Sequence, residues 1–220
     1  MSDKPKFRMP ERAVRVFPGE MAKTTHTFKE EEDKMAPRYV LLPSGRRASR
    51  VILGGVITEL FKSTETSERG SYEKWSARLV GPTGGIQLSA STMFEGQGAA
   101  VAMLERLPNA PFDAIVIGKP KIFGEGDDTV TIISIESIVP VGPADVVDVV
   151  VEAAIELANV IRPGQEPTPD MIKARAIYKD NNEELIGYLD SALKYVQRRG
   201  VKVGEADGCE VDLRASAMSS

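Results

Sequence analysis

The chain has 220 residues, of which 42% are hydrophobic and 27% charged, and its formal net charge is −4. This composition is ordinary for a soluble globular protein of one large or two small domains. The longest apolar run, at 146–151, is far shorter than the roughly 20 residues that span a bilayer. The charged N-terminus lacks the apolar segment of a secretion signal, so we expect a cytoplasmic protein. Its mild acidity excludes affinity for nucleic acid over the whole surface but not a local basic groove.

Residues 1–45 are predicted to form an arm that packs on the domain after it. Over the first twenty residues, basic side chains and prolines are interspersed with apolar residues such as Val14 and Phe17. The acidic run at 30–33 predicts a solvated loop, because like charges repel. A short strand is expected at 39–42, before the turn that begins at Pro43.

The segment 46–142 carries the signals of a small barrel. Apolar alternation and turn residues predict three strands, a helix and two strands, at 51–61, 75–80, 86–91, 95–107, 114–123 and 130–139. Gly54 and Gly55, inside the first strand, predict a bend or bulge of the kind found at a barrel corner. This order of elements is that of the OB fold, a five-stranded barrel that binds oligonucleotides. We therefore predict a mainly β fold with helices: an OB barrel, a long assembly helix and a small C-terminal helical segment.

The assembly helix is predicted over 143–162, with Pro143 at its start and Pro163 just after its end. Its polar residues form one narrow stripe, and nearly all the others are apolar. Such a helix has to be covered on more than one side, and a small barrel covers only one. We expect a partner subunit to cover the other side, through Val146, Val147, Val150, Ala154, Leu157 and Ile161. The alternative is burial by the helices that follow in the same chain.

A linker and a pair of helices are predicted over 163–200, and a disordered tail over 201–220. The two helices are expected at about 170–179 and 182–199, the second with apolar residues at helical spacing. The pair is either a small docking module for another protein or a continuation of the core.

Catalytic residues are hard to find in this sequence. His26 is the only histidine and Cys209 the only cysteine, and neither has a neighbouring motif that would activate a nucleophile or bind a metal. The segment 95–101 resembles a dinucleotide-binding glycine motif but ends on a valine, and no suitable βαβ unit follows. We predict that the protein is not an enzyme and uses no metal or cofactor.

Single-stranded DNA needs cations along its phosphates and flat side chains on which its bases stack. The basic and aromatic residues on or before the barrel strands are the candidates: Arg46, Arg47, Arg50, Lys74, Trp75, Arg78, Lys119, Lys121 and Phe123. For Trp75, packing in the core is an equally good interpretation. For Arg78 and the two lysines, which alternate with core positions, the alternative is an ordinary solvated strand face.

Several segments resemble the archaeal replication protein A-associated proteins. The likeness covers roughly 7–140 and is carried by residues 8–12, 16–20, 25–30, 36–45, 75–84 and 116–120, among which Tyr-Val-Leu-Leu-Pro at 39–43 is quite specific. Barrels of this family often have an aspartate where this chain has Gly81. A hairpin turn is still expected at this position, but without the acidic side chain of the family.

The resemblance implies an OB fold, no catalysis and a place beside the large archaeal replication protein A subunit in DNA replication, repair and recombination. In heterotrimeric replication protein A, a helix follows each subunit's barrel and the three helices form a bundle, which would suit the apolar helix at 143–162. Two hypotheses follow. The chain is a subunit that binds single-stranded DNA, or it is an assembly subunit with little or no direct contact with DNA.

Overall fold

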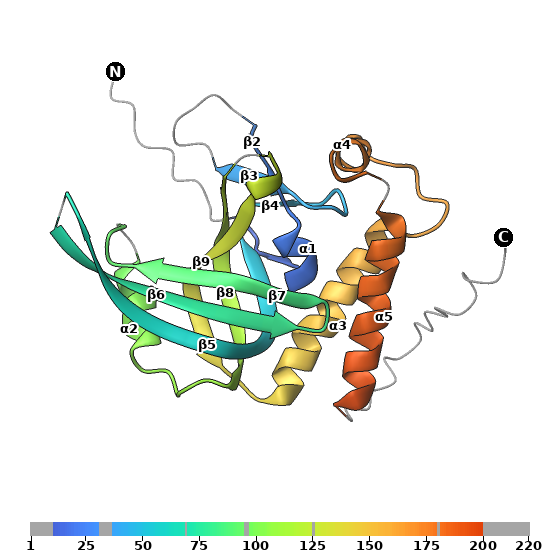
Figure 1. Ribbon diagram of the computed structural model, residues 1–220. Helices are drawn as coiled ribbons and strands as arrows, with labels where there is room; N and C mark the ends of the chain where they lie inside the picture. The colour runs from blue at the N-terminus through green and yellow to red at the C-terminus, as the bar shows by residue number, and fades with distance from the viewer. Residues whose placement is uncertain are drawn as a thin grey trace, which may run out of the picture.

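A ring of five paired strands forms the centre of the structure, a computed structural model that describes residues 11–30, 37–68, 70–94, 97–124, 126–179 and 181–199 (Figure 1). The strands are β5 (Val51–Ser67), β6 (Gly70–Gly81), β7 (Gly84–Ser91), β8 (Phe112–Phe123) and β9 (Val130–Pro140). The order β5-β6-β7-β9-β8 returns to β5, because β5 also pairs with β8. Only the β7–β9 pairing in this ring is parallel. With α2 (Gly98–Leu104) between β7 and β8, this is the predicted OB topology, which is confirmed.

Two barrel elements differ in length from the sequence prediction. β5 continues to Ser67 because its second half pairs with β6 as a hairpin arm that extends beyond the ring (Figure 1). Polar, exposed residues make up most of this arm, so the apolar pattern did not mark it as strand. The helix predicted over 95–107 is shorter, since only Gly98–Leu104 is helical.

The bulge in β5 lies between Ile57 and Glu59 rather than at the two glycines. Gly54 and Gly55 are needed for a different reason, since neighbouring residues approach the backbone closely at both positions. A Cβ atom on Gly54 would lie 3.0 Å from Cβ of Val149 in the helix packed against this strand, and one on Gly55 would lie 2.6 Å from the carbonyl oxygen of Val80. The glycines therefore let neighbouring elements pack directly on the backbone of β5.

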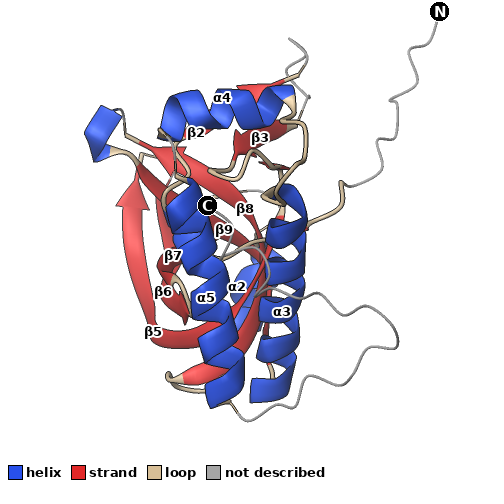
Figure 2. Ribbon diagram, turned by 90° about the vertical axis from the view of Figure 1, so that its right-hand side faces the viewer, coloured by secondary structure: helices blue, strands red, loops and turns tan. Residues whose placement is uncertain are grey.

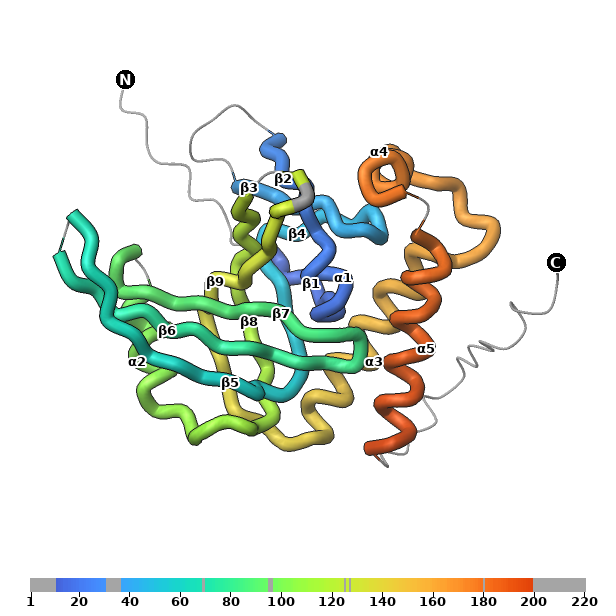
Figure 3. Tube along the Cα trace, in the orientation of Figure 1, coloured from blue at the N-terminus to red at the C-terminus, as the bar shows by residue number. Residues whose placement is uncertain are grey.

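The N-terminal segment packs on the barrel and adds a second sheet. β1 (Val14–Arg15) pairs in parallel with β5, and α1 (Pro18–Ala22) follows it. α1 and the residue before it link two cores, since Met21 is buried in the barrel core and Phe17 in a separate helical core. β2 (His26–Lys29), β3 (Arg38–Leu41) and β4 (Arg47–Ala48) form the second, three-stranded sheet, near the β8–β9 end of the barrel (Figure 3). Residues 1–10, 31–36 and 200–220 lie outside the described residues, so the predicted acidic loop is only partly described and the predicted tail is not described at all.

Three helices follow the barrel in the part of the chain that the structure describes: α3 (Pro143–Val160), α4 (Pro169–Tyr178) and α5 (Asn182–Arg198). α3 lies between the barrel and α5, and α4 crosses over one end of the pair (Figure 2). α3 starts at Pro143, where the Asp145 carboxylate accepts a 2.8 Å hydrogen bond from the N–H of Gly142. Among the described helices, none is both long and apolar enough to cross a membrane.

The main difference from the sequence prediction concerns which residues cover the apolar face of α3. Leu185, Tyr188, Ala192 and Val196 of α5 form one buried cluster with the apolar face of α3. Of the six predicted interface residues, Val146, Val147, Val150 and Leu157 are at most 3% exposed, and Ala154 and Ile161 are half-buried against the same cluster. The chain's own α5 therefore occupies the face that we had assigned to a partner subunit, and the alternative of burial within the chain is the one observed.

Candidate nucleic-acid interface

The outer side of the strands β5, β6, β7, β9 and β8 presents two rows of aligned side chains, which we call the barrel face. In the first row the strand register aligns Arg78, Gln87, Ile132 and Lys121. The second row contains Phe61, Ser76, Ser89, Ser134 and Lys119. The residues between these positions, such as Leu79 and Leu88, are buried in the barrel core, so the rows are directed away from it. Within the second row Ser134 is covered, since it is 5% exposed and its hydroxyl accepts a hydrogen bond from the side chain of Gln97.

Cations without an acidic partner lie at both ends of the first row. Arg78 is exposed, and neither Arg78 nor Lys121 forms an ion pair with any residue in the part of the chain that the structure describes. Because adjacent strands are about 4.8 Å apart, the path between these residues along the curved barrel wall, over β7 and β9, is roughly 14 Å. Because β6 and β8 also both border β5 in the closed ring, Arg78 and Lys121 face different sides of the barrel. They contact different phosphates of one strand only if that strand curves around the barrel wall.

Aromatic side chains border the barrel face. Phe61 is 62% exposed, Phe123 is 53% exposed and Phe94, in the loop after β7, is 51% exposed. The ammonium of Lys121 lies 4.4 Å from the centre of the Phe94 ring, which is a cation–π contact. Burial, and after it the charge of Lys119, lowers the pKa of Lys121 below its ordinary value of 10.5. An approaching phosphate would oppose both effects on the pKa of Lys121, because a negative partner favours the charged ammonium.

Other lysines of this region are held by glutamates. Lys119 pairs with Glu136 at 3.2 Å, and Glu136 also accepts from Arg50. On the hairpin arm, Lys74 pairs with Glu65 at 2.9 Å, and Lys62 with Glu73 at 2.7 Å. Exposed pairs of this kind contribute about 0–1 kcal/mol, so a phosphate can replace the carboxylates.

Trp75 belongs mainly to the barrel core. Its side chain is on the same side of β6 as Ala77 and Leu79, and it is partly buried against the core cluster. The ammonium of Lys62 lies 5.7 Å from its ring centre. Of the two interpretations that the sequence left open for Trp75, the structure favours packing over base stacking.

Arg46 contacts α1, β1 and α3 and serves as a structural residue. Its side chain is 11% exposed and binds the fully buried carboxylate of Glu20 at 2.7 Å. The guanidinium also donates to the carbonyl oxygen of Arg15 at 2.9 Å, to Ser44 Oγ at 3.1 Å and to Glu156 at 3.3 Å. Because its N–H groups donate to acceptors within the protein, we do not propose Arg46 as a DNA-binding residue.

Arg47 is held in a similar way at the second sheet. Its guanidinium pairs with Asp170, at the start of α4, and with Glu30, and it lies 5.2 Å from the ring centre of Phe28. Hydrogen bonds to Asp170 are the main cause that raises the pKa of Arg47. The arginine therefore fastens α4 to the three-stranded sheet.

The structure thus divides the nine predicted residues. Arg78, Lys119 and Lys121 lie on the barrel face, Phe123 borders it and Arg50 reaches its border through Glu136. Lys74 is on the same side of β6 as Arg78 but pairs with Glu65, whereas Trp75 packs against the barrel core. Arg46 and Arg47 face other elements. Sequence reasoning missed Phe61, Gln87 and Phe94. Phe94 could have been found as an aromatic residue in a polar loop. The outward position of Phe61 follows from the bulge before it and had no signal in the sequence.

Comparisons with known proteins give matches in structure only. No protein-family model and no curated protein matches the sequence. Among solved structures, the second single-stranded DNA-binding protein (SSBb) from Mycobacterium smegmatis aligns with 42% of this chain and 86% of its own, with 10% identity and a TM-score of 0.33. The second OB-fold domain of replication protein A from Methanococcus maripaludis aligns with 41% of this chain and 82% of its own, with 16% identity and a TM-score of 0.31. A structure of yeast Stn1 and Ten1 aligns with 61% of this chain and 64% of its own, with 12% identity and a TM-score of 0.40.

Proposed function

We propose that the protein binds single-stranded DNA across the barrel face. The observation that carries the proposal is the row from Arg78 to Lys121, which has a cation without an acidic partner among the described residues at each end and exposed phenylalanines at its borders. In OB folds the second and third strands and the adjoining loops bind oligonucleotides. Here those strands are β6 and β7, on which Arg78 and Gln87 lie.

The energetics favour binding that depends little on base sequence. Contacts between cations and phosphates act on any strand, and each stacked base adds about 1–3 kcal/mol, because every base has a flat face. Phe61, Phe94 and Phe123 are exposed enough to stack. Because the net charge is −4, attraction for DNA depends on local groups of cations such as those of the barrel face.

In finer terms, we propose a subunit of an archaeal replication protein A-type complex that acts in DNA replication, repair and recombination. The support is the resemblance of the segments at 36–45 and 75–84 to the replication protein A-associated family, together with the OB topology. Assembly through the apolar face of α3 is no longer part of this proposal, since α5 covers that face.

The second candidate is an assembly subunit with little or no direct contact with DNA. One observation favours it, namely that most basic residues near the barrel face already have glutamate partners, as for Lys62, Lys74 and Lys119. Under this hypothesis Arg78 and Lys121 are ordinary solvated side chains.

A salt titration of DNA binding separates the two candidates. Fluorescence anisotropy of a labelled oligothymidine would be measured with the full chain at several salt concentrations. If the barrel face binds, log K falls linearly with log[salt], and each phosphate that the protein neutralises contributes about 0.7 to the slope. Arg78→Gln and Lys121→Gln should each reduce the slope by about that amount. Phe61→Ala should weaken binding by about 1–3 kcal/mol with little change in slope.

Arg198→Gln is the matched control, because Arg198 is an exposed cation on α5 and does not belong to a barrel strand. It should leave both affinity and slope unchanged. An absence of binding at low salt, or equal effects of the Arg198 and Arg78 substitutions, would reject the barrel face and favour the assembly role.

A further inference from the structure

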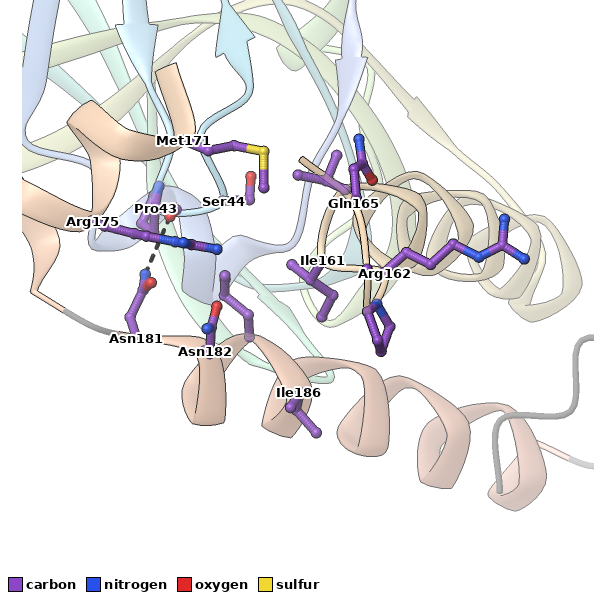
Figure 4. A pocket seen from close by; sticks show the side chains of 14 residues that line it. Pro43, Ser44, Ile161, Arg162, Gln165, Met171, Arg175, Asn181, Asn182 and Ile186 are labelled. Carbon is purple, nitrogen blue, oxygen red and sulfur yellow. Dashed lines mark hydrogen bonds between the residues drawn. The ribbon is translucent and has the colours of Figure 1, made fainter. Parts of the chain in front are cut away.

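A second concave region lies away from the barrel, where the turn after β3 meets the end of α3 and the start of α5 (Figure 4). The cavity has a volume of about 310 Å³. Its wall comes from that turn, α3, the linker after it, α4 and α5, and it includes Ser44, Ile161, Met171, Arg175, Leu185 and Ile186. None of its lining residues belongs to β5–β9.

Specific contacts hold the cavity walls in place. The side-chain amide of Asn181 donates to the carbonyl oxygen of Pro43 at 3.3 Å, and the hydroxyl of Tyr178 donates to that of Leu41 at 2.6 Å. α4 lies so close to the turn that a Cβ atom on Gly45 would come within 2.7 Å of the Met171 Cα. Gly45 also has a φ of +84°, which glycine adopts without strain. The cavity is therefore preformed, which lowers the entropy cost of binding a ligand.

The lining combines an apolar surface with positive charge. Ile161, Met171, Leu185 and Ile186 supply aliphatic surface, and Arg175 extends across the opening in Figure 4, whereas Arg162 points away from it. Among the described lining residues there is no aspartate or glutamate, although acids outnumber bases in the whole chain. Arg175 has no ion pair with any residue that the structure describes.

These features select a ligand class. A carboxylate would pair with Arg175 in a charge-assisted hydrogen bond, and an aliphatic side chain would fit against the leucine, isoleucine and methionine of the wall. No aromatic side chain lines the described part of the cavity, so a nucleotide base would find no stacking partner there. A volume of about 310 Å³ is at the small end of ligand cavities and suits one or two side chains rather than a large cofactor.

We propose that this cavity is a docking site for a short acidic peptide segment of a partner protein, with an aliphatic side chain inserted in the cavity and a carboxylate bound by Arg175. The site is separate from the barrel face, so peptide and DNA can be bound together. The proposal does not depend on DNA binding, and each can fail without the other.

The test uses the full chain and a fluorescein-labelled hexapeptide, Gly-Asp-Asp-Leu-Asp-Leu, in a fluorescence anisotropy titration. We expect saturable binding that Arg175→Gln weakens at least about tenfold, as expected when one charge-assisted hydrogen bond is removed. Ile186→Ser should weaken binding about three- to tenfold, because less apolar surface of the peptide is then buried. Both side chains are exposed, so thermal unfolding of the variants should match that of the parent protein. In NMR spectra the side-chain amides of Asn181 and Asn182 should shift on addition of the peptide.

The matched controls are Arg198→Gln, which changes an exposed arginine outside the cavity, and a peptide with asparagine in place of each aspartate. The variant should bind the probe as the parent does, and the asparagine peptide should bind at least about tenfold more weakly. Absence of saturable binding, equal binding of the asparagine peptide or an equal weakening in Arg198→Gln would overturn the proposal. Displacement of the peptide by oligothymidine would also overturn it, since the cavity would then belong to a nucleic-acid site.

Discussion

Replacing Arg46 with methionine would leave the carboxylate of Glu20 buried without its cation. Glu20 is 0% exposed, and its other hydrogen bond is a 3.3 Å contact from the N–H of Ser44. Removing one partner of a buried ion pair costs about 3–5 kcal/mol, because the remaining charge stays desolvated. At about 2–4 °C per kcal/mol for a chain of this size, the melting temperature should fall by roughly 6–20 °C.

Urea denaturation followed by the fluorescence of Trp75, the only tryptophan, would measure this decrease in stability. Arg47→Met is the matched control: the side chain of Arg47 is much more exposed, and its removal should cost only about 0–1 kcal/mol. The double variant Glu20→Leu with Arg46→Met should recover most of the stability, because no charge is then left unpaired. Under conditions where Arg46→Met is folded, its affinity for DNA should equal that of the parent protein.

A destabilisation below about 1 kcal/mol for Arg46→Met would show that the guanidinium is not needed to neutralise Glu20. A weaker affinity for DNA in folded Arg46→Met, with stability unchanged, would restore Arg46 to the DNA-binding residues and refute the structural role.

Two further predictions concern the helical core and the response to pH. Val150→Asp should prevent stable folding, because this side chain is buried in the helical core that α3 forms with α5. Ile155→Asp, on the exposed side of α3, should unfold at the parent's temperature. A folded monomer of Val150→Asp would contradict burial within the chain. Burial, and after it a nearby lysine, lowers the pKa of His26 below its ordinary value of 6.5, so the unfolded chain binds the proton first as pH falls. Stability should therefore decrease as pH falls through 6.5 and below, and His26→Gln should remove part of this decrease in thermal unfolding; an identical pH profile for His26→Gln would disprove the contribution.

The residues of the barrel strands were enough to predict the OB fold. Alternation at Trp75, Ala77 and Leu79, the turn between β6 and β7, and the helix between β7 and β8 are local patterns, and their order along the chain admits few topologies. The direction of Arg78, Lys119 and Lys121 away from the core also followed from the strand period. Features that depend on residues close together in the sequence, such as strands, turns and the order of elements, could therefore be predicted.

The tertiary structure decided which of the candidate residues can act together. The apolar circumference of α3 requires cover on two sides, but apolar contact has no direction, so the sequence could not tell a partner subunit from α5 of the same chain. Ion pairs could not be predicted from the sequence for a similar reason. Arg46 and Arg78 look alike in the sequence, but the fold places Glu20 beside Arg46 and leaves Arg78 without an acidic partner among the described residues. Periodicity depends on neighbours along the chain, whereas the availability of a charge depends on residues that are distant in sequence and meet only when the chain folds.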